Sequence, residues 1–294
     1  MKTQEEYFDT PLSEWSLPVR ALNKVGEVIV GKSMRIMFRV KVEGLDVMDR
    51  LPEGRPVMVA GNHTSYTDPM LVYEVLWPKR IRYMSKQGLI ENHRILSWFL
   101  AWFGVFPVYH DTRARKSVKR AVTMLKRGEM VGIFPEGRRV LEDDKSNVEL
   151  QNGVALIAKM ADAIIVPVGI DGADRICPHK SHIPHFPKIT LRFGEPVDYR
   201  DWPELRKNDL FDAVTNETMR RVYCLRDGIE PGPTPESSHE VHSEDGSGRR
   251  KPQGDAAEKV PDAASDEVEP GTERVSGAVE TSADPAGAAS AAGR

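Results

Sequence analysis

Short apolar runs alternate with stretches of helical periodicity along most of this 294-residue chain, and this alternation is the strongest constraint on its fold. The expected strands cover residues 40–42, 57–60, 81–85, 105–109, 130–134, 164–170 and 189–193. The expected helices cover residues 18–40, 68–76, 112–126, 152–160 and 210–225. Strands that alternate with helices indicate an α/β fold with a mostly parallel central sheet flanked by helices. In such sheets, ligands bind at the carboxyl ends of the strands.

The composition of the chain changes sharply near residue 230. Residues 231–294 contain no Leu, Ile, Met, Phe, Tyr, Trp or Cys, and they carry 13 acidic and 6 basic side chains. Such a segment buries too little apolar surface to offset its ordering entropy, so we expect a disordered acidic tail. The whole chain has a net charge of −3, which leaves residues 1–230 mildly basic. We therefore predict an amphipathic N-terminal region over residues 1–42, an α/β domain over residues 43–230 and a disordered tail over residues 231–294.

The expected N-terminal helix combines an apolar stripe with a basic face. The stripe consists of Leu22, Val25, Ile29, Ile36 and Val40. The charged side chains of the other face are Arg20, Lys24, Glu27, Lys32, Arg35 and Arg39. A basic amphipathic helix of this kind suits the surface of an anionic bilayer. The alternative is a surface helix whose apolar stripe packs on the domain.

Several features bear on the compartment. The two cysteines, Cys177 and Cys224, form no disulfide framework and indicate a reducing environment. The first residues are acidic and precede no apolar core, so no signal peptide is expected, and no stretch is long and apolar enough to span a bilayer. We therefore expect a peripheral protein at the cytoplasmic face of a membrane. The apolar segment 95–103 is too short to span, and it fits either the core or a lipid-facing surface.

The stretch Asn62-His63-Thr64-Ser65-Tyr66-Thr67-Asp68 joins an expected strand to an expected helix. It places His63 at the corner and Asp68 in the first helical turn. A carboxylate that accepts one ring proton of a histidine fixes the tautomer and stabilises the charge that develops when the other ring nitrogen takes a proton. The pair therefore fits a general base and its orienting partner. The alternative is a histidine and an aspartate that make local turn and cap hydrogen bonds.

A second motif, Phe134-Pro135-Glu136-Gly137-Arg138-Arg139, follows another expected strand, and an apolar strand with Val166-Pro167 comes later. Together with the His63 motif, these resemble the glycerolipid acyltransferase family over roughly residues 38–200. In that family the motifs read Asn-His-x4-Asp and Phe-Pro-Glu-Gly-Thr-Arg. The resemblance implies an O-acyltransferase that moves a fatty acyl group from acyl-CoA or acyl-carrier protein to lysophosphatidic acid, giving phosphatidic acid.

The resemblance also implies a role for each matching residue. His63 is the expected general base and Asp68 its partner. Arg139 stands at the arginine of the third motif, and its planar guanidinium suits an acceptor phosphate. Glu136 is expected to bind acceptor hydroxyls or to orient the arginine, and backbone N–H groups after His63 or at Gly137 are candidate donors to the oxyanion. The predicted substrate-binding residues are Asn62, Lys86, Arg113, Glu136, Gly137 and Arg139.

The acceptor half of the pattern departs from the family. Where the family's second motif carries an acceptor-binding arginine, this chain has His110, and Arg113 is the nearest substitute. The threonine of the third motif is replaced by Arg138, and a commonly basic position is Gln151. The acceptor is therefore open: lysophosphatidic acid, glycerol-3-phosphate, another lysophospholipid, an amino-lipid or a glycolipid.

One further alternative comes from another functional class. A non-catalytic module could keep the fold and bind lipid through the basic N-terminal helix, although the intact His63 and Asp68 pair argues against it. The expected partners are an acyl thioester donor, a lyso-acceptor and an anionic membrane surface, with no nucleic acid. We expect no cofactor and no metal, because the spacing of Cys177, His179, His182 and His185 fits no common zinc pattern.

Overall fold

The structure is a computed structural model that describes residues 9–10, 14–79, 81–86, 100, 104–108, 114–140, 148–178 and 184–234. The helices are α2 (Leu17–Met37), α3 (Asp68–Leu76), α6 (Ala114–Lys126), α7 (Gly153–Ala161) and α8 (Lys207–Asp227). The strands are β1 (Lys41–Glu43), β2 (Val57–Gly61), β3 (Ile81–Lys86), β4 (Phe106–Val108), β5 (Met130–Ile133), β6 (Ile164–Asp171) and β7 (Thr190–Phe193). Short 3-10 helices cover Leu45–Asp49, Ala173–Arg175 and Tyr199–Asp201.

The strands form one sheet with the order β1-β7-β6-β2-β5-β3-β4. Neighbouring strands run parallel, except that β6 and β7 pair in an antiparallel arrangement. Parallel pairing brings the carboxyl ends of β2 and β5 to the same edge of the sheet, and both predicted motifs follow these two strands. The predicted α/β fold with a mostly parallel sheet is confirmed.

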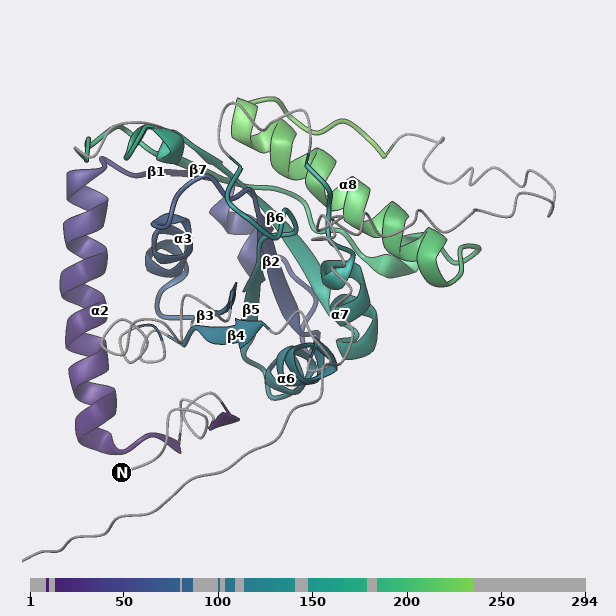
Figure 1. Ribbon diagram of the computed structural model, residues 1–294, viewed down its shortest axis with the longest axis horizontal. Coiled ribbons are helices and arrows are strands. Elements are labelled where there is room, and N and C mark those ends of the chain that lie inside the picture. Colours follow the sequence, from purple (N-terminus) through teal and green to yellow (C-terminus); the bar gives the residue numbers. More distant parts are fainter. Residues whose placement is uncertain are drawn as a thin grey trace, which may run out of the picture. The chain divides into compact units, whose positions relative to one another are not determined.

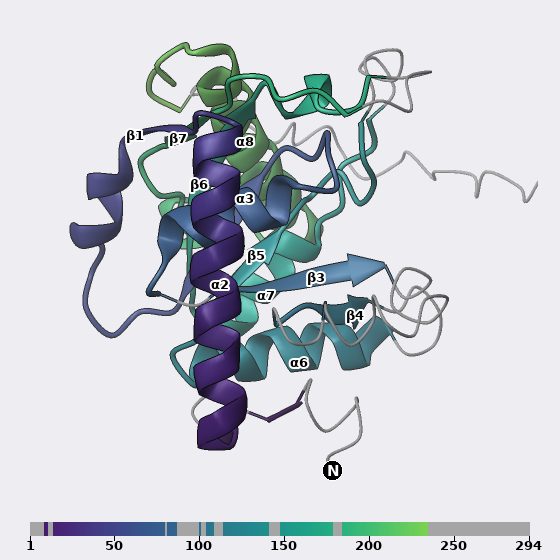
Figure 2. The same cartoon turned by 90° about the vertical axis from the view of Figure 1, so that its left-hand side faces the viewer.

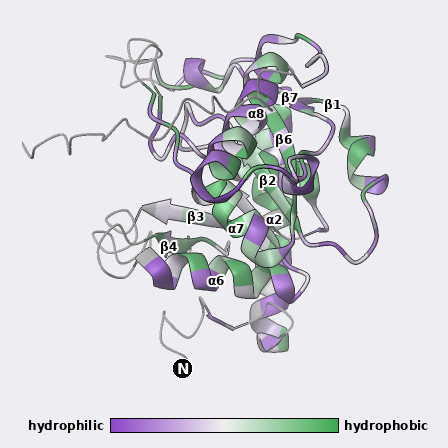
Figure 3. Ribbon diagram, turned by 90° about the vertical axis from the view of Figure 1, so that its right-hand side faces the viewer, coloured by the Kyte–Doolittle hydropathy of each residue, from purple (hydrophilic) through white to green (hydrophobic). Residues whose placement is uncertain are grey.

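Helices cover both faces of the sheet (Figure 1). On one face α3 packs on the strands and α2 packs outside it, whereas α6, α7 and α8 cover the other face. The central strands β2 and β6 are therefore buried on both sides, which explains why their sequences are continuous apolar runs rather than alternating ones. Figure 3 shows the hydrophobic colour gathered on α7 and on the strands behind it.

The inner side of α2 packs closely on α3 (Figure 2). Gly31 allows this approach, because a Cβ there would come within 2.7 Å of Cγ of Glu74 on α3. Met34 and Phe38 join the hydrophobic core, and Arg35 forms an ion pair with Glu74 at 3.6 Å. The C-terminal half of α2 is thus anchored to the domain.

Three residues of the predicted apolar stripe lie on the outer side of α2, whereas Val40, beyond the end of the helix, packs against the core. Val25, Ile29 and Ile36 are 55%, 62% and 78% exposed. The alternative in which these three side chains pack on the domain is therefore wrong. Among the helices of the described residues, none is long and apolar enough to cross a membrane.

The predicted bounds of the strands and helices agree with the structure to within one to three residues. Two predictions fall largely outside the described residues. Of the apolar segment 95–103 only Leu100 is described, and it packs against the core. The expected tail is described only over residues 231–234.

Candidate active site

The turn after β2 is fixed to the neighbouring strand by Asn62. Its amide nitrogen donates to the carbonyl of Ile170 at 2.9 Å, and its amide oxygen accepts from the Ile170 N–H at 2.8 Å. The side chain is completely buried. Asn62 was predicted among the substrate-binding residues, and the structure places it beneath the site, where it holds the end of β2 against the end of β6.

His63 and Asp68 are in direct contact, as the sequence predicts. The distance from Nδ1 of His63 to Oδ2 of Asp68 is 2.9 Å. The same oxygen accepts the N–H groups of Thr64 at 2.8 Å and Ser65 at 2.7 Å. The carboxylate is thus held by donors from its own turn. Because the Asp68 side chain is 0% exposed and that of His63 is 18% exposed, only the imidazole is reachable from solvent.

A stack of rings supports the imidazole. The ring of His63 lies over Phe134 with centroids 4.4 Å apart, and Phe134 stacks in turn on Tyr83 at 5.7 Å. Tyr83 lies against Gly132 of β5, where any Cβ would collide with the phenol ring. Burial and the nearby Asp68 raise the pKa of Tyr83 well above its ordinary value, so the phenol stays neutral. No sequence pattern predicted this stack, since Tyr83 lies in β3 whereas His63 and Phe134 follow β2 and β5.

Glu136 connects the second motif to the backbone of His63. Its Oε2 accepts the His63 N–H at 2.6 Å, and its Oε1 accepts the hydroxyl of Tyr223 on α8 at 3.0 Å. Burial raises the pKa of Glu136, and the two hydrogen bonds partly offset this effect. The described hydrogen bonds of Glu136 therefore go to the corner and to α8, and none goes to Arg139. Tyr223 is a site residue that no sequence signal pointed to.

Arg139 lies beside the His63 turn. The backbone N–H of Val140 donates to the carbonyl of His63 at 2.8 Å, which places the second motif directly against the first. The guanidinium carbon of Arg139 lies 3.6 Å from the centroid of the Tyr66 ring. A cation stacked on an aromatic face at this distance is stabilised by the ring quadrupole. Tyr66, one of the four residues between His63 and Asp68, thus contacts the predicted phosphate-binding residue.

The candidate oxyanion donors are already engaged. The N–H groups of His63, Thr64 and Ser65 donate to carboxylates, and the N–H of Gly137 donates to the carbonyl of Phe134 at 3.0 Å. In this structure the turn therefore uses these N–H groups to hold its own shape. Gly137 has a φ of 66°, which favours glycine at this tight turn.

The two remaining predicted residues are Lys86 and Arg113. Lys86 ends β3 at the carboxyl edge of the sheet. Arg113 lies outside the described residues. Within the described part of the chain, no group of three or more His, Cys, Asp or Glu side chains is arranged to hold a metal ion.

The fold and the site define an α/β protein with a histidine–aspartate pair at the carboxyl edge of its sheet. The model of the family described as Acyltransferase matches residues 39–171. The chain is 30% identical over 182 residues to the 1-acyl-sn-glycerol-3-phosphate acyltransferase of Bacillus subtilis, which covers 62% of this chain and 87% of that protein. It is also 30% identical over 179 residues to the enzyme of the same name from Streptococcus pneumoniae, covering 60% of this chain and 63% of that protein.

A solved structure shows the same fold. The crystal structure of the 1-acyl-sn-glycerophosphate acyltransferase PlsC from Thermotoga maritima matches with a TM-score of 0.51 and 22% identity, covering 69% of this chain and 82% of that one. The chain belongs to the glycerolipid acyltransferase family, whose members are O-acyltransferases. The family predicted from the two motifs is confirmed.

Proposed function

We propose that the protein transfers a fatty acyl group from a thioester, acyl-CoA or acyl-carrier protein, to the free hydroxyl of 1-acylglycerol-3-phosphate, which gives phosphatidic acid. The names of the relatives support this acceptor. The observation that carries the proposal is the 2.9 Å contact between His63 and Asp68, with the imidazole as the solvent-reachable member of the pair.

In this proposal, His63 and Asp68 carry out the proton transfer from the acceptor hydroxyl. Asp68 accepts the Nδ1 proton of His63, so Nε2 is free to take the proton of the acceptor hydroxyl as its oxygen attacks the thioester carbonyl. The tetrahedral intermediate then expels the thiol, which leaves with the proton held by the imidazolium. The thioester is already activated, so this route needs no covalent acyl-enzyme.

Arg139 is the proposed ligand of the acceptor phosphate. Its guanidinium can bind two phosphate oxygens at once, and Tyr66 holds it beside the turn that carries His63. Glu136 would then act by positioning the backbone of His63 rather than by binding an acceptor hydroxyl. A second candidate, acyl transfer to another lyso-acceptor, is favoured by the His110 substitution in the second motif.

The helix α2 would hold the enzyme on an anionic membrane that contains its lipid acceptor. The exposed side chains of Val25, Ile29 and Ile36 can enter the interface, while the exposed Arg20 and Lys32 on the same helix supply positive charge for anionic headgroups. Peripheral binding at the cytoplasmic face is part of the proposal.

The decisive experiment measures thiol release from acyl-CoA in the presence of 1-acylglycerol-3-phosphate. His63→Ala should lower kcat by about 10²–10⁴-fold, because the substitution removes the general base. The matched control is His185→Ala, since His185 is an exposed histidine outside the site. Thermal unfolding should show that both variants fold. Unchanged turnover in folded His63→Ala would rule out the mechanism.

Competition between acceptors separates the two candidates. Phosphorylated and unphosphorylated lyso-acceptors are compared at equal concentration in mixed micelles. A preference for the phosphorylated acceptor that disappears in Arg139→Gln supports 1-acylglycerol-3-phosphate. Equal use of both acceptors would instead favour a different lipid acceptor.

A further inference from the structure

A charged hollow lies along α6 and includes none of the residues of the candidate active site. Its volume is about 280 Å³, and its lining consists of Asp9, Lys116, Lys119, Arg120, Thr123, Met124 and Arg127. Four of these side chains are cationic and one is anionic, so the lining has a net positive charge. A hollow with such a charge concentrates small multivalent anions.

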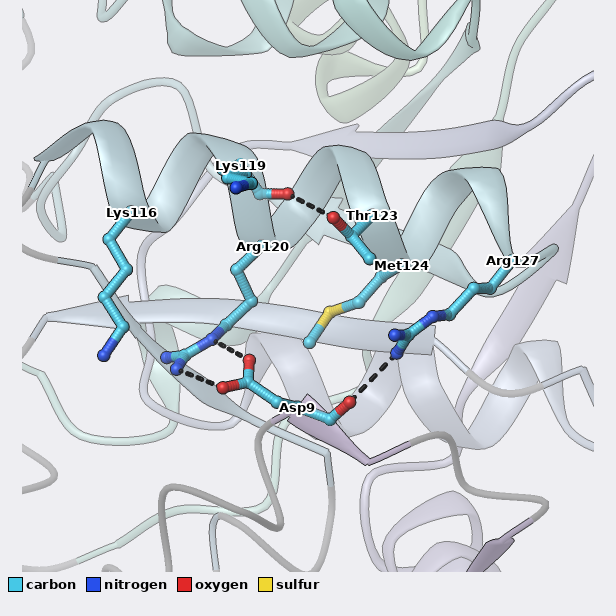
Figure 4. A pocket seen from close by; sticks show the side chains of 7 residues that line it. All are labelled: Asp9, Lys116, Lys119, Arg120, Thr123, Met124 and Arg127. Carbon is cyan, nitrogen blue, oxygen red and sulfur yellow. Dashed lines mark hydrogen bonds and ion pairs between the residues drawn. The ribbon is translucent and has the colours of Figure 1, made fainter.

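The centre of this hollow is an ion pair between two residues 111 positions apart. Arg120 donates from Nε to Oδ1 of Asp9 at 2.7 Å and from Nη2 to Oδ2 at 3.1 Å. Arg127 donates to the backbone carbonyl of Asp9 at 2.9 Å. Figure 4 shows Arg120 of α6 and Arg127 just after the helix reaching toward Asp9, with Lys116 on the same side.

The two members of this pair differ in exposure. The side chain of Arg120 is 3% exposed, whereas that of Asp9 is 58% exposed. A buried guanidinium requires an anionic partner, because an uncompensated buried charge is strongly unfavourable. The anion that satisfies it here is an accessible carboxylate, which water and solutes can reach.

A phosphate group has the chemistry to take the same place. The fork of an arginine binds two oxygens of a carboxylate or of a phosphate with the same geometry, and a phosphate offers additional oxygens for the neighbouring cations. We propose that the α6 pocket, defined as the seven lining residues above, is a binding site for a phosphate group. The Asp9 carboxylate occupies the anion position and competes with the ligand.

The phosphate can come from three sources: the nucleotide end of a thioester donor, an anionic lipid headgroup or free phosphate. The geometry is shared by all three. The proposal uses neither His63 nor Arg139, so its test stands apart from that of the acyltransferase mechanism.

The first experiment is calorimetric titration of the full-length protein with inorganic phosphate at constant ionic strength. Asp9→Asn should bind phosphate about tenfold tighter than the wild type, because the amide no longer competes as an anion. Arg127→Gln should bind about tenfold more weakly, since one charged hydrogen-bond donor is lost. Both substitutions leave the buried Arg120 in place, and thermal unfolding of each variant shows whether the protein is folded.

Lys126→Gln is the matched control. Lys126 is exposed, ends α6 immediately before Arg127 and lies outside the lining, so its substitution should leave phosphate affinity unchanged. If Lys126→Gln weakens binding as much as Arg127→Gln, the attraction is a general property of the basic helix and the proposal is overturned. Absence of phosphate binding in both the wild type and Asp9→Asn would also overturn it.

The second experiment identifies the source. Adenosine 3′,5′-bisphosphate represents the nucleotide end of the donor, and phosphatidylcholine vesicles with and without phosphatidic acid represent headgroups. The ligand is identified by the probe that binds Asp9→Asn more tightly and Arg127→Gln more weakly than it binds the wild type. If inorganic phosphate alone shows both changes in affinity, the ligand is free phosphate. If every probe binds all variants alike, the pocket is not a phosphate site.

Discussion

The corner that carries His63 and Asp68 and the α6 pocket both pair a buried charge with a more exposed partner, but the two buried charges have opposite signs. In the corner the buried member is the carboxylate of Asp68, whose side chain is 0% exposed. Its partner is His63, whose side chain is 18% exposed. In the pocket the buried member is the guanidinium of Arg120 at 3%, and the partner is Asp9 at 58%.

The two regions also differ in where the supporting hydrogen bonds originate. Every described donor to Asp68 comes from the five residues before it, so the turn itself fixes the carboxylate. Asp9 is held by side chains more than 100 positions away and keeps most of its surface in solvent. The first arrangement is preorganised, and in the proposed mechanism none of these groups must move before proton transfer. The second arrangement allows one anion to replace another.

The same substitution, aspartate to asparagine, should have its largest effect at the corner. In Asp68→Asn the amide oxygen can still accept from His63, Thr64 and Ser65, but the charge that stabilises the imidazolium is lost. We expect kcat to fall by about 10²–10⁴-fold while the unfolding temperature stays within a few degrees of the wild type. Steady-state kinetics and calorimetry measure the two quantities. A fall of less than about threefold in kcat would show that the corner is not a catalytic pair.

Asp9→Asn tests the α6 pocket through its effect on the free energy of unfolding. Removing the charge next to buried Arg120 should lower the free energy of unfolding by about 1–3 kcal/mol in a low-salt buffer without phosphate. Added phosphate should restore stability in this variant more than in the wild type, because binding to the native state is linked to stability. Thermal unfolding at constant ionic strength measures both. Phosphate should not stabilise Asp68→Asn more than it stabilises the wild type. If phosphate restored the stability of both variants equally, the two regions would not differ in phosphate binding.

This contrast also explains how much of the molecule the sequence could predict. The α/β fold, the strand-to-helix corner and the contact between His63 and Asp68 depend on patterns or partners that are close in sequence. Three other interactions join segments that are distant in sequence. They are the hydrogen bond from Tyr223 to Glu136, the stacking of His63 on Phe134 and the ion pair of Asp9 with Arg120. Their residue types are common on any surface, so only the packing of the fold reveals them.

The oxyanion donors illustrate a second limit. Backbone N–H groups near His63 were plausible candidates from the sequence, because a turn before a helix exposes several of them. A sequence does not show that Asp68 and Glu136 already bind those groups. Hydrogen bonding within a turn is decided by its dihedral angles, which the identity of the residues constrains only loosely.

Tyr66 offers a smaller test, which asks whether the preorganisation of the corner extends to the acceptor. Tyr66→Leu removes the ring under Arg139 and should raise the KM for the phosphorylated acceptor about two- to fivefold, which corresponds to the about 0.5–1 kcal/mol of an exposed cation–π contact. We expect kcat to change less than KM. Tyr66→Phe is the matched control and should keep the wild-type KM. If Leu and Phe behave alike, the stack does not position Arg139.

The smallest expected effect concerns Glu136. This buried carboxylate has fewer described hydrogen-bond donors than Asp68, and its burial should therefore affect the pH dependence of the free energy of unfolding. Burial raises the folded-state pKa of Glu136 above its ordinary value of 4.5. A raised pKa means that the folded protein binds the proton more tightly than the unfolded chain does. Protonation of Glu136 therefore stabilises the folded state, and this contribution is fully present below about pH 4.5 and is lost as the pH rises through the folded-state pKa.

Glu136→Gln keeps an oxygen for the His63 N–H and cannot ionise. We therefore expect its stability to depend less on pH than that of the wild type from pH 4.5 upward through the range where Glu136 ionises. At pH 7 it should unfold at the same temperature as the wild type or slightly higher. Denaturant unfolding at several pH values measures the difference between the two curves. Parallel curves would mean that Glu136 has the same proton affinity in the folded and unfolded states, and that its two hydrogen bonds fully offset its burial.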